Sequence, residues 1–278
     1  MNPDLISFLM GSGVGLVLAL TGAGGGILAV PLLVFGLHLS LVQAAPVGLL
    51  AVGIASALGA LLGLREGLVR YRAAAIIGIT GMLVAPLGVQ LAHQLPNAPL
   101  TVAFAFVLAW VALRSLKQAR ALAQAAPTTA EHPAPVRCKL CQIDPTRGKL
   151  RLVTPCVLAL AGTGALSGLL SGLLGVGGGF VIVPMMAAIS NVTMKGIVAT
   201  SLAVISLVSI GGVAGAISQD AVNWQIALPF AAGAAVALLA GRRLGKRLAG
   251  ARLQQAFGVT AAIVAVLLLL RGLGLLHM

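Results

Sequence analysis

The chain has 278 residues, of which 59% are hydrophobic and only 8% are charged. Its mean hydropathy is +1.09, whereas a soluble domain carries about 25% charged residues. This composition excludes an ordinary soluble protein and predicts one embedded in a membrane. The net charge of +13 comes from 18 basic and 5 acidic residues. Because the basic residues cluster between apolar segments, they indicate cytoplasmic loops and exclude a nucleic-acid-binding surface.

Apolar runs that approach or reach the length of a membrane-spanning helix, about 20 residues, recur along the chain. They cover residues 40–64, 73–95, 99–113, 153–174, 197–217, 226–239 and 257–270. The first four residues, Met1 to Asp4, include no basic side chain before the first apolar run. We therefore expect no cleavable signal peptide and keep this segment in the fold.

The two halves of the sequence are related to each other. The segment Gly15–Pro31 is echoed by Gly168–Pro184, at an offset of 153 residues, and each contains the pattern Gly-x-Gly-Gly-Gly. The same offset continues without a gap as far as Phe104 and its counterpart Phe257. The sequence thus predicts a first repeat over residues 1–117, a polar linker over 118–150 and a second repeat over 151–278.

Equivalent loops of the two repeats carry different charges. The loop 65–72 contains three arginines, whereas its counterpart 218–225 contains none and includes Asp220. The next loop shows the reverse, since 93–99 lacks Lys and Arg while 246–252 is rich in them. Under the positive-inside rule the repeats therefore lie in the bilayer in opposite orientations.

Opposite orientation requires an odd number of crossings in each repeat, so we expect the glycine-broken segment of each to return to its own side. As one straight helix, residues 5–37 would run about 50 Å, well beyond a core of about 30 Å. The predicted fold is an all-α polytopic membrane protein with two inverted repeats, each a glycine-broken re-entrant helix pair plus three transmembrane helices. Eight full spans with parallel halves are the alternative.

The glycine breaks predict a binding site. Non-helical backbone at membrane depth is tolerated only where it is buried in protein or lines a cavity, and the N-termini of the following half-helices favour anions. Inverted repeats would bring the two breaks together near the midplane. Close helix packing is the simpler explanation of the glycines. The candidate residues are Thr21, Gly22, Gly24, Gly25 and Gly26 in the first repeat and Gly175, Gly177, Gly178 and Gly179 in the second.

The polar residues of the spans favour an anionic substrate. None of the predicted spans contains Asp or Glu, and cation or proton pumps commonly use intramembrane carboxylates. Among the donors, we select Thr200 and Ser201 together with Lys195, about one and a half helical turns earlier, as candidate ligands. Their first-repeat counterparts, Val47 and Gly48, bring no hydroxyl to an equivalent position, so the predicted site is asymmetric.

Three cysteines offer a different chemistry. Cys138 and Cys141 form a Cys-x-x-Cys pair in the linker. A zinc site would need two further ligands, of which His132 offers one, and a redox role is the other reading. In the cytosol we expect an inert, reduced pair, and we expect Cys156 to belong to the apolar core.

Three features resemble the TauE/SafE sulfite exporter family of bacterial membrane transporters. They are the paired glycine-rich segments ending in proline (22–31 and 175–184), the Ala-Thr-Ser-Leu stretch at 199–202, and the linker stretch 141–149. The resemblance covers nearly the whole chain. It implies transport of small sulfur-containing anions such as sulfite, thiosulfate or sulfonates, or of related organic anions.

The sequence therefore predicts a secondary carrier or facilitator for a small anion in the bacterial cytoplasmic membrane, with the basic linker inside and both termini outside. A membrane thiol oxidoreductase and a non-transporting membrane scaffold are the alternatives. We expect no catalytic residue, cofactor, bound metal or nucleic-acid partner. The expected partners are the anionic substrate and the lipid bilayer, and the sequence leaves a homo-oligomer open.

Overall fold

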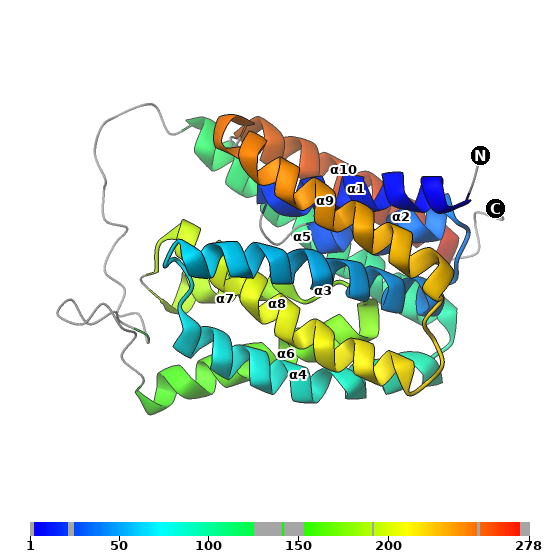
Figure 1. The fold of residues 1–278 in the computed structure, drawn as a ribbon, viewed down its shortest axis with the longest axis horizontal. Coiled ribbons are helices and arrows are strands. Elements are labelled where there is room, and N and C mark those ends of the chain that lie inside the picture. Colours follow the sequence, from blue (N-terminus) through cyan, green and yellow to red (C-terminus); the bar gives the residue numbers. More distant parts are fainter. Residues whose placement is uncertain are drawn as a thin grey trace.

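The computed structural model describes residues 3–21, 25–124, 141, 153–190, 192–248 and 251–272. These residues form α-helices joined by short loops and contain no β-strand (Figure 1). The helices are α1 (Pro3–Thr21), α2 (Gly25–Gly36), α3 (Leu41–Arg65), α4 (Tyr71–Gln94), α5 (Asn97–Gln124), α6 (Thr154–Leu174), α7 (Gly179–Ile189), α8 (Met194–Ile217), α9 (Trp224–Leu248) and α10 (Ala251–Gly272). The all-α prediction is confirmed.

Each repeat contributes the same series of helices. The five helices α1 to α5 have their counterparts in α6 to α10, and both α8 and α9 begin 153 residues after α3 and α4. Helix α5 continues to Gln124, so it extends into the segment predicted as linker.

The first two helices of each repeat form a hairpin. In the first repeat Gly25 packs against Leu18 and Gly36 against Met10, so α1 and α2 are antiparallel. In the second repeat Ser167 donates a hydrogen bond to the carbonyl of Gly178 at 3.2 Å, and α7 returns toward the start of α6 (Figure 1). Each glycine-broken segment therefore turns back, as a re-entrant pair requires.

The two arms of each hairpin differ in length. Helix α6 has 21 residues and is long and apolar enough to cross a membrane, whereas α7 has only 11. The same inequality holds for α1, with 19 residues, and α2, with 12. The predicted pair of half-helices is therefore a long helix followed by a short one.

Helices α3 and α8 lie side by side at the centre of the molecule (Figure 1). They are antiparallel, because Leu49 meets Gly212 near one end while Gly63 meets Ala199 near the other. Both are more extensively buried than the remaining candidate spans. Since α3 and α8 are equivalent helices of the two repeats, their opposite directions fit the predicted inversion.

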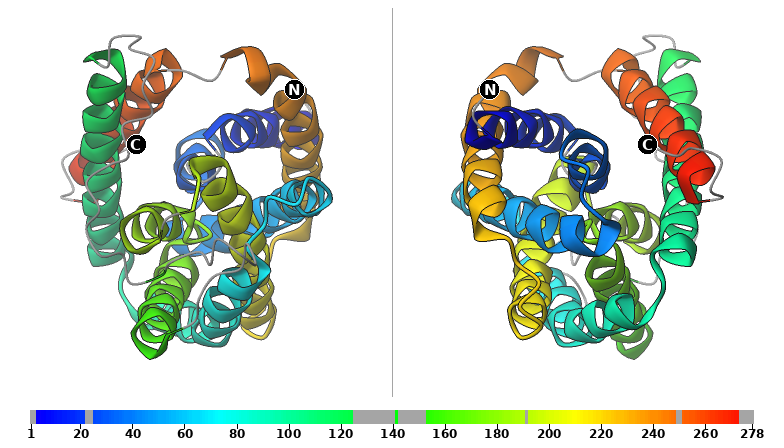
Figure 2. Two further views of the ribbon diagram at one scale, coloured as in Figure 1. Left: turned by 90° about the vertical axis from the view of Figure 1, so that its left-hand side faces the viewer. Right: turned by 90° about the vertical axis from the view of Figure 1, so that its right-hand side faces the viewer.

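The two repeats interlock through glycine-lined contacts. Gly11 and Gly15 of α1 lie against the backbone of α9, and α6 packs against α4 in the equivalent way through Gly164, Gly168 and Gly172. Small residues let helix backbones approach closely, which is a main source of packing energy in lipid. Helices α5 and α10 lie side by side at one flank (Figure 2).

The outer faces of the helices are apolar. Six helices of the described part are long and apolar enough to cross a membrane. Their exposed faces carry side chains that water would solvate poorly and lipid solvates well, among them Leu61, Leu83, Phe106, Leu158, Ile210 and Leu228. The chain is therefore a multi-pass membrane protein.

Charges separate between the two ends of the helix bundle. The end where α3 finishes and α8 begins carries Arg65, Arg70, Arg72, Lys195 and Arg242. The opposite end carries Asp4 and Asp220, with Arg271 as its one described Lys or Arg residue. The separation favours the predicted orientation, in which the arginine-rich end is cytoplasmic.

Arg271 has a local structural explanation at this otherwise arginine-poor end. Its Nη1 donates a hydrogen bond to the carbonyl of Val34 at 3.3 Å, and its guanidinium lies 5.9 Å from the centre of the Phe35 ring. Cations near a helix C-terminus satisfy its last carbonyls and complement its dipole. Arg271 therefore caps α2, and its position need not report membrane orientation.

The cysteine expectation was wrong for Cys141. This residue forms a disulfide with Cys156 in the first turn of α6, with a Cα–Cα distance of 5.3 Å, and both residues are fully buried. The N–H of Cys141 also donates to the carbonyl of Ile189 at the end of α7. The linker thus returns to the open end of the second hairpin, a contact that sequence spacing does not reveal. Cys138 lies outside the described residues.

Cysteine labelling tests the orientation. In a Cys138→Ser background, whose other two cysteines are fully buried, Asn97→Cys should react with a membrane-impermeant maleimide in intact cells. Arg72→Cys, at the opposite end, should react only after permeabilisation. Both positions are exposed, and the unlabelled parent is the control. The reverse pattern would show that the arginine-rich end faces outward.

Candidate functional site

The second glycine break is a tight loop with left-handed backbone. Gly175, Gly177 and Gly178 have φ values of 70°, 74° and 67°, a region that other residues adopt at a cost of about 1–2 kcal/mol. Gly175 ends α6, since its N–H donates to the carbonyl of Ser171 at 2.8 Å. Gly178 is the N-cap residue that directly precedes α7. Glycine is needed here for its conformation as well as for its size.

The loop holds a row of buried N–H groups. Residues 176–180 are all buried, and within the described part of the chain their N–H groups donate no hydrogen bond. Each unpaired buried donor costs about 1–3 kcal/mol. Successive N–H groups in a tight turn at the positive end of a helix form a concavity that attracts anions.

The two breaks meet at the centre of the bundle. Gly26, at the start of α2, packs against the carbonyl of Val176 in the second break. Both Gly26 and Gly177 lie against Val52, in the middle of α3, and Gly177 also lies against Ile205, in the middle of α8. Val52 and Ile205 are equivalent residues, so the second break lies where the axis of the predicted inverted repeats is expected.

A cavity of about 380 Å³ opens at the end of the bundle with few arginines. It is surrounded by the start of α3, the end of α4 and the loop between α8 and α9. Its lining is mixed, and its polar members are Gln43, His93, Gln219, Asp220 and Asn223. We call this cavity the vestibule.

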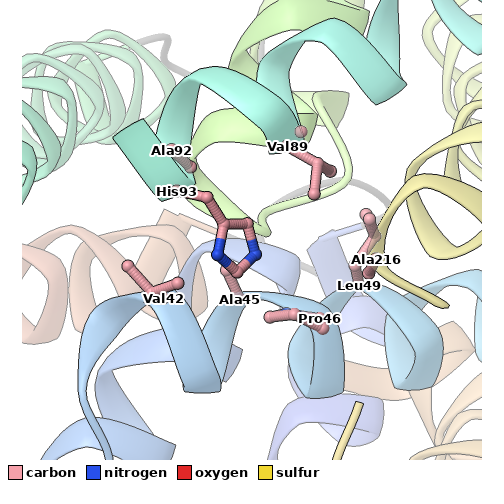
Figure 3. Close-up of a pocket in the computed structure, with 9 residues that line it drawn as sticks. Val42, Ala45, Pro46, Leu49, Val89, Ala92, His93 and Ala216 are labelled. Atoms are coloured by element: carbon pink, nitrogen blue, oxygen red, sulfur yellow. The ribbon is translucent and has the colours of Figure 1, made fainter. Parts of the chain in front are cut away.

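A narrow apolar pocket continues from the vestibule toward the second break. Val42 and His93 line both spaces. Figure 3 shows the imidazole of His93 lying over Ala45 and Pro46. The pocket, of about 10 Å³, is lined at depth by Gly172, and Ala45 packs against Gly175. A cavity of this size holds about one water molecule, so the path between vestibule and break is constricted.

The structure brings the predicted break residues together but not the predicted side-chain ligands. Gly25, Gly26, Gly175, Gly177, Gly178 and Gly179 all lie in or beside the two breaks. Gly22 and Gly24 lie outside the described residues, and of Thr21 only its place at the end of α1 is described.

Thr200, Ser201 and Lys195 lie nearer the arginine-rich end. The hydroxyl of Thr200 donates to the carbonyl of Gly196 at 2.6 Å and accepts from the N–H of Arg70 at 3.0 Å. Ser201 donates to the carbonyl of Val198 at 2.8 Å, and Lys195 is exposed at the start of α8. Both hydroxyls therefore have partners within the protein, and Thr200 ties α8 to the loop before α4.

The vestibule, and the residues that pack against the second break, were missed from the sequence. His93 lies in a predicted outer loop next to a span end, and nothing in its neighbours marks it. Val52 and Ile205 are ordinary apolar residues. The one sequence feature that links them is the 153-residue offset, which makes them equivalent positions of the two repeats. Among the described residues, no group of three His, Cys, Asp or Glu is placed to hold a metal ion.

Comparisons with known proteins agree with this architecture. The profile of the family "Sulfite exporter TauE/SafE" matches residues 7–268. A protein of Xylella fastidiosa strain Temecula1 is 27% identical over 271 residues, and one of strain 9a5c is 28% identical over 268 residues. Each alignment covers 94% of both chains, and both relatives are named "Probable membrane transporter protein". No solved structure matches.

The profile covers the hairpins, the central helix pair and both glycine breaks, and the relatives align over almost their whole length. The chain belongs to the TauE/SafE sulfite exporter family and is a membrane transporter.

Proposed function

We propose that this transporter carries a small oxyanion or sulfonate, such as sulfite, thiosulfate or an organosulfonate, as a secondary carrier or facilitator. The substrate binds at the second glycine break. The single observation that supports this proposal most is the row of buried, unpaired N–H groups at residues 176–180.

These N–H groups suit an anion in a dry environment. Moving an anion out of water is costly unless several hydrogen bonds replace its hydration. Hydrogen bonds to charged groups are worth about 1.5–3 kcal/mol each. Helix α7 adds the partial positive charge of its N-terminus. Helix α6 ends at the same loop, and its C-terminal carbonyl groups carry partial negative charge. The anion therefore lies beside the N–H groups at the start of α7 and away from the end of α6.

The positions of the acidic residues in the described part also support a negatively charged substrate. Glu66 lies just after α3, Asp220 in the loop after α8, and Asp4 in the first turn of α1. No described helix places a carboxylate beside the breaks, so no formal negative charge of these helices would repel an anion or favour a cation there.

Contacts between the repeats suggest how access alternates. At the arginine-rich end, Arg242 of α9 donates to the carbonyl of Gly59 at 2.8 Å and pairs with Glu66 at 3.1 Å. Thr200 binds the N–H of Arg70 at the same end. These contacts join the second repeat to the first, while the vestibule opens at the other end. These contacts must break when one repeat moves against the other and the site opens toward the arginine-rich end.

The alternative of a thiol oxidoreductase is less well supported. Cys141 and Cys156 are both fully buried, so a thiol substrate has no access to their sulfur atoms, and they lie at one end of the bundle. For the scaffold alternative, the linker that would recruit a partner lies almost entirely outside the described residues.

A substitution in the break tests the proposed site. In Gly177→Ala the new Cβ would lie 3.0 Å from Ile205 and 3.2 Å from Val52, at a φ of 74°. The strain should shift the neighbouring N–H groups. We expect sulfite flux into proteoliposomes to fall by roughly tenfold or more, which corresponds to about one lost hydrogen bond to an anion.

Gly67→Ala is the matched control. Gly67 has a φ of 68° but open space around it, in the loop between α3 and α4. It carries the same backbone strain away from the breaks, so its flux should stay near the wild-type level. Equal flux in both variants would contradict the assignment of the break as the binding site.

The role of Thr200 can be separated from substrate binding. Thr200→Val should lower the free energy of unfolding by roughly 1–2 kcal/mol, because the N–H of Arg70 loses its acceptor, and should leave the KM for the anion unchanged. Ser201→Ala, which loses only a bond within α8, is the control. Thermal unfolding in detergent and flux kinetics measure the two effects. A raised KM with unchanged stability would show instead that Thr200 binds the substrate.

A further inference from the structure

Most buried hydroxyls of the described helices are satisfied within the protein. Ser56 donates to the carbonyl of Gly53 at 3.0 Å, Thr163 to Ala159 at 2.7 Å, and Thr200 to Gly196. Two buried hydroxyls differ. Within the described part of the chain, the Oγ atoms of Ser171 and Ser209 have no hydrogen-bond partner. Buried polar groups are nearly always paired, so two exceptions call for an explanation.

Ser171 lies on the side of α6 that faces the second break. Ser167, one turn earlier on the same face, donates to the carbonyl of Gly178 at the start of α7. The glycine stripe of α6, which includes Gly168 and Gly172, packs against α4 instead. Since α6 and α7 are antiparallel, Ser171 lies closer to the loop than Ser167, and it is fully buried.

Ser209 approaches the same region from α8. It lies one turn after Ile205, which packs against Gly177 of the break. A Cβ on Gly53 would lie 3.1 Å from the Oγ of Ser209, so this hydroxyl lies against the middle of α3, one residue along the chain from Val52. Val52 in turn packs against both Gly26 and Gly177. Ser209 is 2% exposed.

We infer that Ser171 and Ser209 are substrate ligands, whose hydroxyls donate hydrogen bonds to oxygen atoms of the anion held by the N–H groups of residues 176–180. The inference rests on the proposed function and extends it to named side chains. The N–H groups supply one set of donors from the loop, and the hydroxyls add two more from α6 and α8. A substrate that uses all of them carries several acceptor oxygens, as sulfite and sulfonates do.

The two hydroxyls also make the site asymmetric. In the first repeat, the counterpart of Ser171 is Leu18, which packs against Gly25. The counterpart of Ser209 is Ser56, whose hydroxyl is already bonded to Gly53. The second repeat therefore brings both free hydroxyls, and Gly26 of the first repeat packs against the second break. One anion bound mainly by the second repeat is the expected stoichiometry.

Ser171→Ala and Ser209→Ala test this inference. Each should raise the KM for sulfite flux, and the Kd from sulfite-dependent thermal stabilisation, by roughly tenfold to a hundredfold. Without sulfite, neither should lower the melting temperature, because removing an unpaired buried hydroxyl costs no internal hydrogen bond. Ser56→Ala is the matched control, since it removes an equivalent hydroxyl that has a partner, and its KM should not change.

The outcomes separate the two proposals. If sulfite, thiosulfate and taurine neither stabilise the wild-type protein nor cross the membrane through it, the proposed function fails and the ligand assignment fails with it. If the wild type responds but the Ser171→Ala/Ser209→Ala double variant keeps its KM within about twofold, the ligand assignment alone is overturned. A lowered melting temperature of the anion-free single variants would also overturn it, because it would reveal a partner within the protein.

Discussion

The structure depends on one constraint, which is that backbone polar groups inside a membrane must find partners. A helix satisfies its own N–H and C=O groups except at its ends. Breaking a helix at membrane depth therefore creates unpaired donors that lipid cannot satisfy. In this chain the second break is enclosed by α2, α3 and α8, through Gly26, Val52 and Ile205. The centre of the bundle therefore encloses this loop on several sides.

Glycine makes this enclosure possible in two separate ways. At Gly175, Gly177 and Gly178 it supplies positive φ angles. On α1 and α6 it supplies flat surfaces on which α9 and α4 lie almost backbone to backbone, as Gly15 and Gly168 show. The second use joins the first long helix of each repeat to the other repeat. Neither hairpin is therefore held only by its own half of the chain, and the two breaks are positioned jointly.

The overall architecture was predictable because it depends on patterns that repeat. The 153-residue register located the breaks and the equivalent helices, and loop charge suggested their directions. Features set by single contacts were not predictable. Thr200 is predicted as a ligand because it is a hydroxyl in an apolar span, but nothing in the sequence indicates its hydrogen bond to Arg70, which joins residues 130 positions apart. The disulfide of Cys141 depends on where the linker returns, which spacing does not encode.

The candidate site shows the same division. The glycines of the breaks were identified from the sequence, because the chemistry of positive φ and exposed N–H groups is carried by the residue type. In the sequence, Ser171 and Ser209 cannot be told apart from Ser56 and Ser201, because all four are serines within apolar segments. Only their geometry distinguishes them, since a helical serine normally bonds to a carbonyl one turn earlier. The absence of that bond within the described residues is visible in three dimensions alone.

The asymmetry between the repeats fits a carrier better than a symmetric pore. The fold supplies an axis at Val52 and Ile205, yet the vestibule lies at one end and the Arg242, Glu66 and Thr200 contacts at the other. Inverted repeats can exchange these two conformations, so that each end opens in turn around a fixed loop. The ion pair between Arg242 and Glu66 at the arginine-rich end is partly exposed, so it is individually weak. A weak ion pair at the closed end, together with a deeply packed break, suits the alternating access proposed above.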